Sequence, residues 1–273
     1  MGAMSDTQPS FRSEQINPGD LARLVDVLDR QAALPGIVRL RSWAMLALAP
    51  RPGEHALDVG SGTGSEVQAF AAVVGSAGDA VGVEPNPWMR AVAEERASEH
   101  ASSARFIEGN AYELPFPDAT FDVVRCERVF QHLADPERAA VEIARVLKPG
   151  GRAVVIDSDW ATAIMHPGDP EVLSALSGSM LAATPNPYSG RRLAGQLTRA
   201  GLKVTDIGSQ ALLQESDATG DGSFLRVMAA MAVARGVITE DQSTALVDEL
   251  AVAAEVGDFH MSVTMFAVLA HKV

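Results

Sequence analysis

A glycine-rich turn at residues 57–64 constrains the fold of this chain more than any other feature. It reads Leu-Asp-Val-Gly-Ser-Gly-Thr-Gly and joins a short apolar run, which predicts a buried strand, to a stretch with helical spacing. Its glycines permit a tight turn and let a ligand lie against bare backbone. Ligands of open α/β sheets bind at the carboxyl ends of the strands, so the turn predicts a ligand-binding loop in such a sheet.

Predicted strands alternate with predicted helices along most of the chain. The strands fall at residues 55–59, 80–83, 105–107, 121–124 and 153–156, with helices at 65–74, 87–100 and 136–147. This spacing predicts βαβ units, so we expect an α/β fold with a parallel sheet and helices on both faces. The tail breaks the alternation, with predicted strands at 202–207 and 263–270 and helices at about 221–235 and 240–255.

The same patterns divide the chain into five expected parts. Residues 1–18 carry no periodicity and begin like a cloning remnant, so they predict a disordered or tag-derived terminus. The other parts are two N-terminal helices of a cap at 19–50, a cofactor-binding core at 51–159, a helical cap insertion at 160–200, and the C-terminal part of the core sheet with its helices at 201–273.

The spacing of the glycines distinguishes between the classes of ligand that bind glycine-rich turns. A dinucleotide fingerprint needs a third glycine where this chain has Ser65, and a P-loop needs a lysine that the turn lacks. A carboxylate, Asp58, stands at the start of the turn, which suits a ligand with an amine and would repel a pyrophosphate. Glu84 ends the second predicted strand, where a carboxylate can accept hydrogen bonds from both hydroxyls of a ribose.

Four stretches of the chain together resemble the class I S-adenosylmethionine-dependent methyltransferases. The similarity is to the small-molecule type, akin to the ubiquinone/menaquinone-biosynthesis methyltransferases, and it lies in residues 57–64, 82–86, 108–116 and 121–151. The resemblance implies a Rossmann-like sheet of seven strands, mostly parallel with an antiparallel last strand. It also implies S-adenosylmethionine as cofactor and S-adenosylhomocysteine as product. The segments before residue 50 and at 160–200 match only loosely, and such enzymes select their substrates there.

The resemblance assigns roles to residues of the first two strand ends. Gly60 and Gly62 would let the methionine part of the cofactor approach the backbone, and Asp58 would orient the turn or bind the amine. Glu84 would hold the ribose hydroxyls, and Pro85 would pack near the adenine.

Further cofactor roles fall after the third and fourth predicted strands. Asn110 and Ala111 would read the adenine edge, and Cys126 and Glu127 would approach the cofactor from below. The family usually has aspartate where this chain has Asn110. An amide oxygen can still accept a hydrogen bond from the adenine amine, so we expect somewhat weaker cofactor binding.

Three polar residues are candidates for the chemistry, because they follow the fourth and fifth predicted strands. His132 lies after the fourth strand, and an unperturbed histidine can accept a proton near neutral pH. Asp157 and Asp159 follow the fifth strand directly, so one of them is expected to orient His132 or the acceptor. In the alternative, His132 only packs its loop and shapes the pocket, and the two carboxylates are solvated strand ends.

Composition narrows the partners and the location. The chain has 22 Lys and Arg against 35 Asp and Glu, a formal net charge of −13. Such a surface repels phosphate backbones and anionic lipid, so we expect neither nucleic acid nor a membrane as a partner. Cys126 is the single cysteine, and we find no secretion signal and no apolar run of the roughly 18 residues that span a membrane. These features predict a cytoplasmic protein, and no His/Cys/Asp spacing suggests a metal site.

These observations favour a methyltransferase for a small, partly apolar acceptor, most readily at a hydroxyl oxygen. The preference for oxygen depends on His132 and the carboxylates near it. Methylation at carbon or nitrogen is the first alternative. A second alternative is a protein that retains the cofactor site without methylating, such as a cyclase or a regulatory binder.

Overall fold

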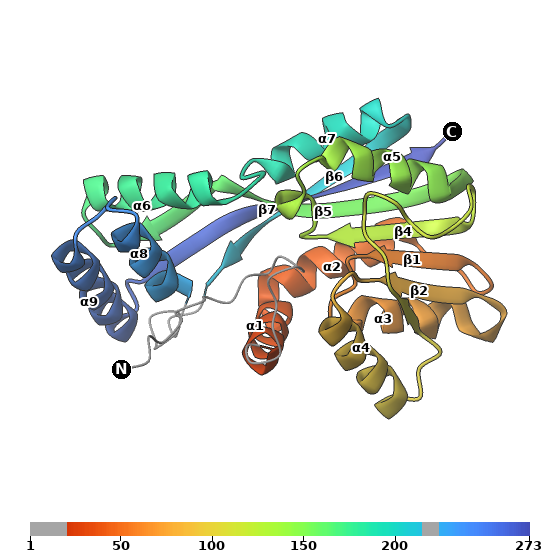
Figure 1. Cartoon of the computed structure of the whole chain (residues 1–273), viewed down its shortest axis with the longest axis horizontal. Helices are drawn as coiled ribbons and strands as arrows, with labels where there is room; N and C mark the ends of the chain where they lie inside the picture. Colours follow the sequence, from red (N-terminus) through yellow and green to blue (C-terminus); the bar gives the residue numbers. More distant parts are fainter. Residues whose placement is uncertain (1–20, 215–223) are drawn as a thin grey trace, which may run out of the picture.

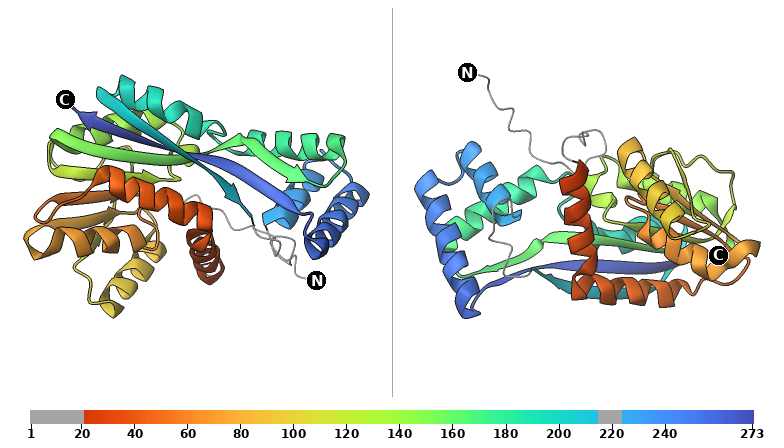
Figure 2. Two further views of the ribbon diagram at one scale, coloured as in Figure 1. Left: turned by 180° about the vertical axis from the view of Figure 1, so that it is seen from behind. Right: turned by 90° about the horizontal axis from the view of Figure 1, so that it is seen from below.

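A computed structural model describes residues 21–214 and 224–273 and shows an elongated molecule with two lobes (Figures 1 and 2). The larger lobe is a sheet with helices on both faces, and the smaller lobe is a group of helices at the far end of the longest strands. The sheet has seven strands in the order β3-β2-β1-β4-β5-β7-β6. The predicted terminus at 1–18 and the start of the helix predicted near 221 lie outside the described residues.

The first five strands form the parallel part of the sheet. They are β1 (His55–Val59), β2 (Asp79–Val83), β3 (Arg105–Ile107), β4 (Phe121–Glu127) and β5 (Leu147–His166). β1 lies between β2 and β4, and all pairs among these five strands are parallel. The βαβ arrangement predicted from the alternating pattern is therefore confirmed.

The last strand of the chain, β7, runs opposite to the other six strands of the sheet. β7 (His260–Lys272) lies between β5 and β6 (Leu202–Leu213) and pairs antiparallel with both. The expected antiparallel last strand is thus confirmed. β5 pairs with β7 past a bulge as far as His166 opposite His260, and β6 pairs with β7 as far as Leu213 opposite Ser262, so these strands reach from the sheet lobe toward the helical lobe (Figure 1).

Helices cover the sheet on both faces because each buries one apolar side. Figure 1 shows α5 (Pro136–Val146) and α7 (Ser189–Arg199) on one face, with α2 (Pro35–Leu48), α3 (Ser65–Val74) and α4 (Pro87–Glu99) on the other. On the first face Ile143 and Leu193 pack with Val155, and on the second Leu40 and Phe70 pack with strand residues. α1 (Leu21–Ala33) precedes α2 at the edge of this second layer.

The sequence predicts residues 160–200 as one cap, but the structure divides this range. α6 (Pro170–Ala183) packs with α8 (Phe224–Ala234) and α9 (Glu240–Val256) around a hydrophobic cluster of their own, which includes Leu176, Met228 and Leu250. In contrast, α7 belongs to the core through Leu193. The helices expected as a cap at 19–50 divide in the same way, since α2 packs on the sheet.

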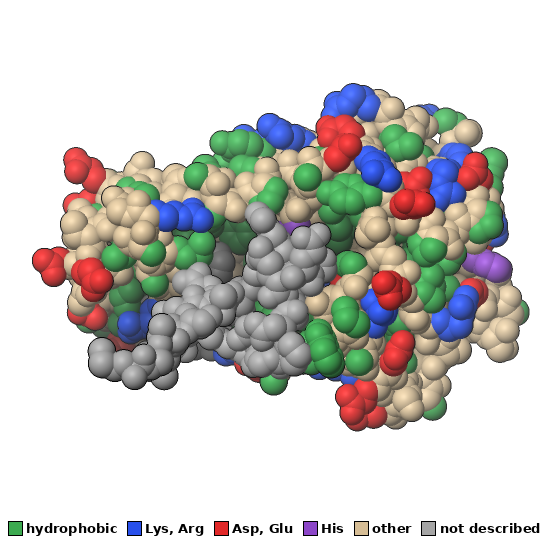
Figure 3. Space-filling view, in the orientation of Figure 1, with side chains coloured by type: hydrophobic (Ala, Val, Ile, Leu, Met, Phe, Trp, Pro, Cys, Tyr) green, Lys and Arg blue, Asp and Glu red, His purple; other side chains and the backbone are tan. Residues whose placement is uncertain are grey.

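Two features of the structure concern the charge of the surface and the length of the helices. On the face shown in Figure 3, acidic and basic side chains are interspersed over the sheet lobe. Within residues 21–214 and 224–273, no helix is both long enough and apolar enough to cross a membrane.

Candidate active site

The glycine turn leads from β1 to the N-terminus of α3, and its backbone lies in the left-handed region. The φ angle is +73° at Gly60, +51° at Gly62 and +83° at Gly64. A Cβ on Gly60 would lie 2.4 Å from Cγ2 of Val129, whereas a Cβ on Gly62 would meet no heavy atom within 4 Å. Gly60 is therefore packed against the segment after β4, and Gly62 faces open space in which a ligand can approach the backbone.

Glu84, at the end of β2, is held by two backbone N–H groups. Gly62 donates to Oε2 at 3.0 Å and Asn86 donates to Oε1 at 2.9 Å. Burial raises the pKa of Glu84, although these two donors oppose the shift. A carboxylate has about four acceptor positions, so each oxygen retains capacity for a further hydroxyl donor. Arg90 fixes the strand end by donating to the carbonyl oxygens of Glu84 at 2.8 Å and Pro85 at 3.1 Å.

Asp58 faces a buried charged cluster beneath the turn. Its carboxylate lies 3.2 Å from the guanidinium of Arg125, which also pairs with Glu127 and lies 3.5 Å from Glu66. Arg41 of α2 pairs with Glu127 at 2.9 Å and with Glu66 at 3.3 Å. Asp58 was expected to orient the turn or bind an amine. The structure pairs it with Arg125, and the cluster links α2 to β1, β4 and α3.

The charges in this cluster shift one another's protonation. Burial raises the pKa of Asp58 to about 6, although Arg125 opposes it. Burial also acts to raise the pKa of Glu127, but the neighbouring arginines outweigh it and bring the pKa to about 2. One of these is Arg128, which also bonds to Gln31 of α1. Glu127 is thus ionised and surrounded by cations.

Cys126 and Glu127 lie on opposite faces of the sheet, because successive residues of a strand point to opposite faces. Cys126 is fully buried in the hydrophobic cluster on the α5 side of the sheet, and burial raises the pKa of its thiol. Glu127 lies in the charged cluster on the other side. The expected approach of Cys126 and Glu127 to the cofactor from below stays a prediction.

Asn110 and Ala111 lie in the turn after β3. The Asn110 Oδ1 accepts the N–H of Tyr112 at 2.9 Å, and Ala111 is buried. The Tyr112 hydroxyl accepts the N–H of Ala134 at 2.7 Å. The turn expected to read the adenine thus contacts the segment that follows His132.

His132 ends a short 3-10 turn, η3 (Phe130–His132), and is half-buried. The N–H of Gln131 donates to Asp157 Oδ2 at 2.7 Å, and the Gln131 carbonyl accepts the N–H of Asn186 at 3.1 Å. The segment before His132 contacts the glycine turn through Val129 and Gly60, and the backbone of its neighbour Gln131 is bonded to Asp157 and Asn186.

Asp157 is completely buried and accepts three hydrogen bonds. They come from the N–H of Gln131, the N–H of Ser158 at 2.8 Å and the hydroxyl of Ser189 at 2.9 Å. Burial raises the pKa of Asp157 to about 7, although these donors oppose the shift. Through the N–H of Gln131, Asp157 holds the turn that carries His132, and its expected role in orienting His132 or the acceptor stays a prediction.

Asp159 is also completely buried, and it pairs with Arg191 of α7. Two nitrogens of the Arg191 guanidinium donate to its carboxylate. They are Nε, which bonds to Oδ2, and Nη2, which bonds to Oδ1 at 2.9 Å. Arg191 in turn lies over the ring of Tyr188, 5.3 Å from its centroid. These contacts give Asp159 a partner on α7, and its expected role in orienting His132 or the acceptor stays a prediction.

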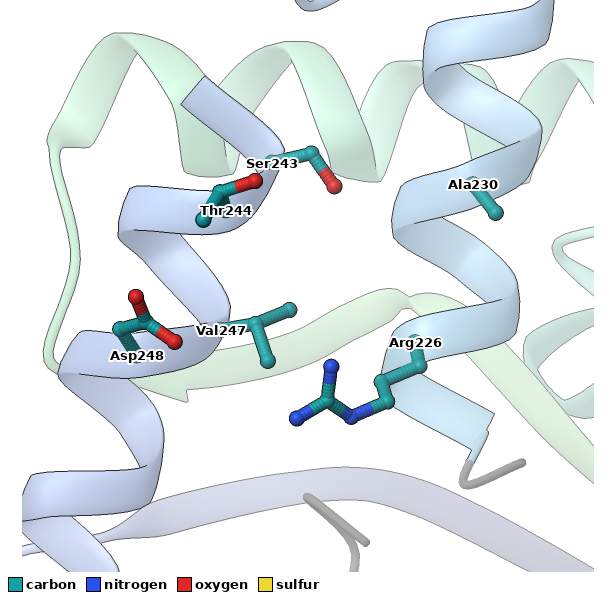
Figure 4. Close-up of a pocket in the computed structure, with 6 residues that line it drawn as sticks. All are labelled: Arg226, Ala230, Ser243, Thr244, Val247 and Asp248. Carbon is teal, nitrogen blue, oxygen red and sulfur yellow. The ribbon is translucent and has the colours of Figure 1, made fainter. Parts of the chain in front are cut away.

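A separate pocket of about 240 Å³ lies in the helical lobe between α8 and α9 (Figure 4). It is lined by Arg226, Ala230, Ser243, Thr244, Val247 and Asp248. It contains none of the residues predicted to bind cofactor or acceptor. Among the described residues, no group of three or more His, Cys, Asp or Glu side chains is placed to hold a metal ion.

Several residues of the site were missed from the sequence. Arg125 did carry a signal, because a charged residue interrupts an apolar strand and a buried charge needs a partner. Arg41 on a predicted helix and Asn186 between two helices carried none. Their contacts depend on which elements fold next to the turn, and one sequence does not show that.

Comparisons with known proteins show which family and which proteins this chain resembles. Residues 57–155 match a family model described as a methyltransferase domain. An uncharacterized 37.1 kDa protein in transposon TN4556 of Streptomyces fradiae is 32% identical over 248 residues, 90% of this chain and 70% of that protein. The ubiquinone/menaquinone biosynthesis C-methyltransferase UbiE of Vibrio campbellii is 35% identical over 109 residues, 39% of this chain and 42% of that protein. This chain therefore spans less than half of that enzyme.

The fold has counterparts among solved structures. The cyclase SpnF superposes with a TM-score of 0.52 at 22% identity, covering 86% of this chain and 80% of that chain. At this level of identity the likeness concerns the fold alone.

Proposed function

Because the chain belongs to the class I S-adenosylmethionine-dependent methyltransferases, we propose that it methylates a hydroxyl of a small, partly apolar acceptor, with His132 as the base. The observation that supports this best is the position of the turn that carries His132. Val129, just before the turn, packs on Gly60, and Ala134, just after it, bonds to Tyr112. The segment around His132 thus contacts both loops that are expected to hold the cofactor.

The residues present fit the cofactor at two points. Gly62 leaves open space beside its backbone, and Glu84 presents carboxylate oxygens with spare acceptor capacity. We propose that these two hold the methionine part and the ribose, and that Asn110 and Ala111 face the adenine. Asp58 contributes through Arg125, by keeping the strand ends beneath the turn in place.

S-adenosylmethionine, when bound, supplies a methyl group already activated by a sulfonium. The chain's own work is then alignment and exclusion of water. A base adds to this for a hydroxyl acceptor, typically by about 10²–10⁴-fold. We assign that role to His132, which takes the hydroxyl proton and leaves the oxygen with the electron pair that forms the new bond to carbon.

We assign selection of the acceptor to segments outside the strands that carry the glycine turn. α1 and the lobe of α6, α8 and α9 lie outside residues 57–155, which match the family model, and α1 reaches the site edge through the contact of Gln31 with Arg128. Hydrogen exchange should therefore slow in α1 and α6 when cofactor and acceptor are both bound.

Two alternatives keep the same fold. Methylation at carbon is the first, because the Vibrio relative is named a C-methyltransferase, and nitrogen is a further acceptor atom. A cyclase or cofactor-dependent binder that does not methylate is the second, because a structural neighbour is named a cyclase.

Product analysis tests the proposal. The protein is incubated with S-adenosylmethionine and a panel of small phenols, aliphatic alcohols, amines and activated carbon acids, and the products are analysed by mass spectrometry and NMR. We expect a mass gain of one methylene on a hydroxyl compound, with one S-adenosylhomocysteine per product. Transfer confined to carbon or nitrogen acceptors would overturn the assignment of oxygen. Conversion of an acceptor without mass gain would indicate a cyclase.

A further inference from the structure

Asn186 makes an unusual set of contacts for a residue between two helices. Its side-chain Nδ2 donates to the carbonyl of Phe130 at 3.0 Å and also to the carbonyl of Leu133. Its own N–H donates to the carbonyl of Gln131 at 3.1 Å. One residue thus holds three carbonyl groups in and directly after the turn that carries His132.

Asp157 holds the same turn from β5. It accepts the N–H of Gln131 at 2.7 Å and the hydroxyl of Ser189 at 2.9 Å. The N–H of Ser189 in turn donates to the Asn186 carbonyl at 3.2 Å. Asp157 and Asn186 are therefore parts of one hydrogen-bonded unit with Ser189 between them.

Trp160 adds a third support. Its ring N–H donates to the side-chain oxygen of Gln131 at 2.7 Å, and its backbone N–H donates to the carbonyl of Pro187 at 2.8 Å. The side chain of Gln131 is buried beneath the turn. The connection between α6 and α7 is thus bonded to β5 and to the turn at several points.

A turn of three residues has little capacity to hold its own shape. Inside the turn, His132 donates to Val129 and Leu133 donates to Phe130, and these are single 3-10 bonds of poor geometry. A catalytic side chain must be held within about 0.5 Å of its productive position by residues around it. The outside partners supply what the turn lacks.

We propose that Asn186 and Asp157 are positioning residues that fix the turn at Phe130–His132 and thereby place the His132 imidazole. This inference rests on the proposed role of His132 as the base. Both residues act through the backbone of the turn. Asp157 is completely buried, so it has no surface with which to touch the acceptor. Because Asn186 lies in the short connection between α6 and α7, three residues after the end of α6, the same bonds tie this connection to the turn that carries His132.

The test uses the full-length protein with histidine labelled with ¹³C at Cε1. The chain has six histidines, and the His132 signal is assigned by its loss in His132→Gln. In Asn186→Ala we expect the His132 signal to shift or broaden, while the other signals keep their wild-type positions. Asn186→Asp should have the same effect, because a carboxylate cannot donate to the carbonyls of Phe130 and Leu133. Pro185→Ala, an exposed neighbour, is the control and should leave all signals unchanged.

A milder variant keeps the test valid if Asn186→Ala fails to fold. Ser189→Ala removes only the hydroxyl bond to Asp157, and it should move the His132 signal in the same direction by a smaller amount. An unchanged His132 signal in folded Asn186→Ala, or in folded Ser189→Ala if only that variant folds, would overturn the proposal.

Activity separates this inference from the proposed function. If His132→Ala retains kcat while Asn186→Ala moves the His132 signal, the role as base is wrong and the positioning is right. If His132→Ala loses kcat while the signal stays in place, the base is right and the positioning is wrong. If both hold, adding Asn186→Ala to His132→Ala should reduce kcat no further, because residues that act as a unit are not additive.

Discussion

Val129 packs directly on the α-carbon of Gly60, so that a Cβ at residue 60 would lie 2.4 Å from Val129 Cγ2. The two residues belong to different loops, the glycine turn after β1 and the segment after β4 that leads to His132. The contact leaves no room for a side chain at residue 60. The position of the proposed base therefore depends on the shape of the turn proposed to hold the cofactor.

Gly60→Ala should lower the free energy of unfolding by about 2–5 kcal/mol. A left-handed φ costs a non-glycine residue about 1–2 kcal/mol, and overpacking adds about 1–3 kcal/mol. Urea unfolding measures the loss. Val129→Ala would leave its Cβ at 3.7 Å from the new methyl, an ordinary contact. The two substitutions should therefore compensate in a double-mutant cycle, and strict additivity would show that the clash is not what destabilises Gly60→Ala.

Gly62→Ala should affect cofactor binding more than stability. No atom lies within 4 Å of its Cβ position, so the free energy of unfolding falls only by the cost of a left-handed φ, about 1–2 kcal/mol. The new methyl stands where we propose that the cofactor passes, so calorimetry should show weaker binding of S-adenosylhomocysteine. Gly150→Ala is a matched control, since Gly150 also has a positive φ and open space. Equal binding by Gly62→Ala and wild type would place the cofactor elsewhere.

Glu84→Gln should weaken the binding of S-adenosylhomocysteine by about 1–3 kcal/mol. Hydrogen bonds to a charged group contribute about 1.5–3 kcal/mol, and the amide retains only one acceptor oxygen for Gly62, Asn86 and the ribose. Isothermal calorimetry measures the change, with Glu94→Gln on the exposed side of α4 as the control. NADH should not raise the melting temperature of wild type. Unchanged affinity in Glu84→Gln would rule out the ribose contact.

Asp157 should make the stability of the protein depend on pH. Burial raises its pKa from the ordinary value of 3.8 to about 7, so the folded state keeps a proton that the unfolded chain releases. The stabilisation from this proton is complete below about pH 4 and is lost as the pH rises through about 7. The free energy of unfolding of wild type relative to Asp157→Asn should therefore fall between pH 5 and pH 8. Urea unfolding of both proteins at several pH values tests this, and a constant difference would contradict it.

The parallel half of the sheet could be predicted because its signals are local. The strand at His55–Val59 and the turn after it lie within a few residues of each other, and the observed strand has the predicted bounds. The length of β5 could not be predicted in this way. Its apolar run covers 153–156, yet the strand extends to His166 because those residues pair with β7, about a hundred positions later.

In the site, too, the residues with local sequence signals could be predicted, and the contacts that depend on tertiary structure could not. Glu84 and Gly62 were both placed near the cofactor from spacing and resemblance, and the structure bonds them to each other. For Asp157, strand order placed the residue near the His132 turn, but only the fold shows that its bond is to the Gln131 backbone. Asn186 lies in a stretch without periodicity, so its contacts with the turn depend entirely on tertiary structure.

His132→Ala should lower kcat by about 10²–10⁴-fold while the affinity for S-adenosylhomocysteine stays nearly constant. The loss reflects removal of the group that takes the hydroxyl proton, and that group contributes in the transition state rather than in cofactor binding. His132→Gln should not restore activity, because an amide accepts no proton at neutral pH. His100→Ala, an exposed histidine at the end of α4, is the control and should retain kcat. Rates are measured with the acceptor found by product analysis. A loss of tenfold or less, with a flat pH–rate profile between about 5.5 and 8, would show that alignment alone drives transfer and that His132 only shapes the pocket.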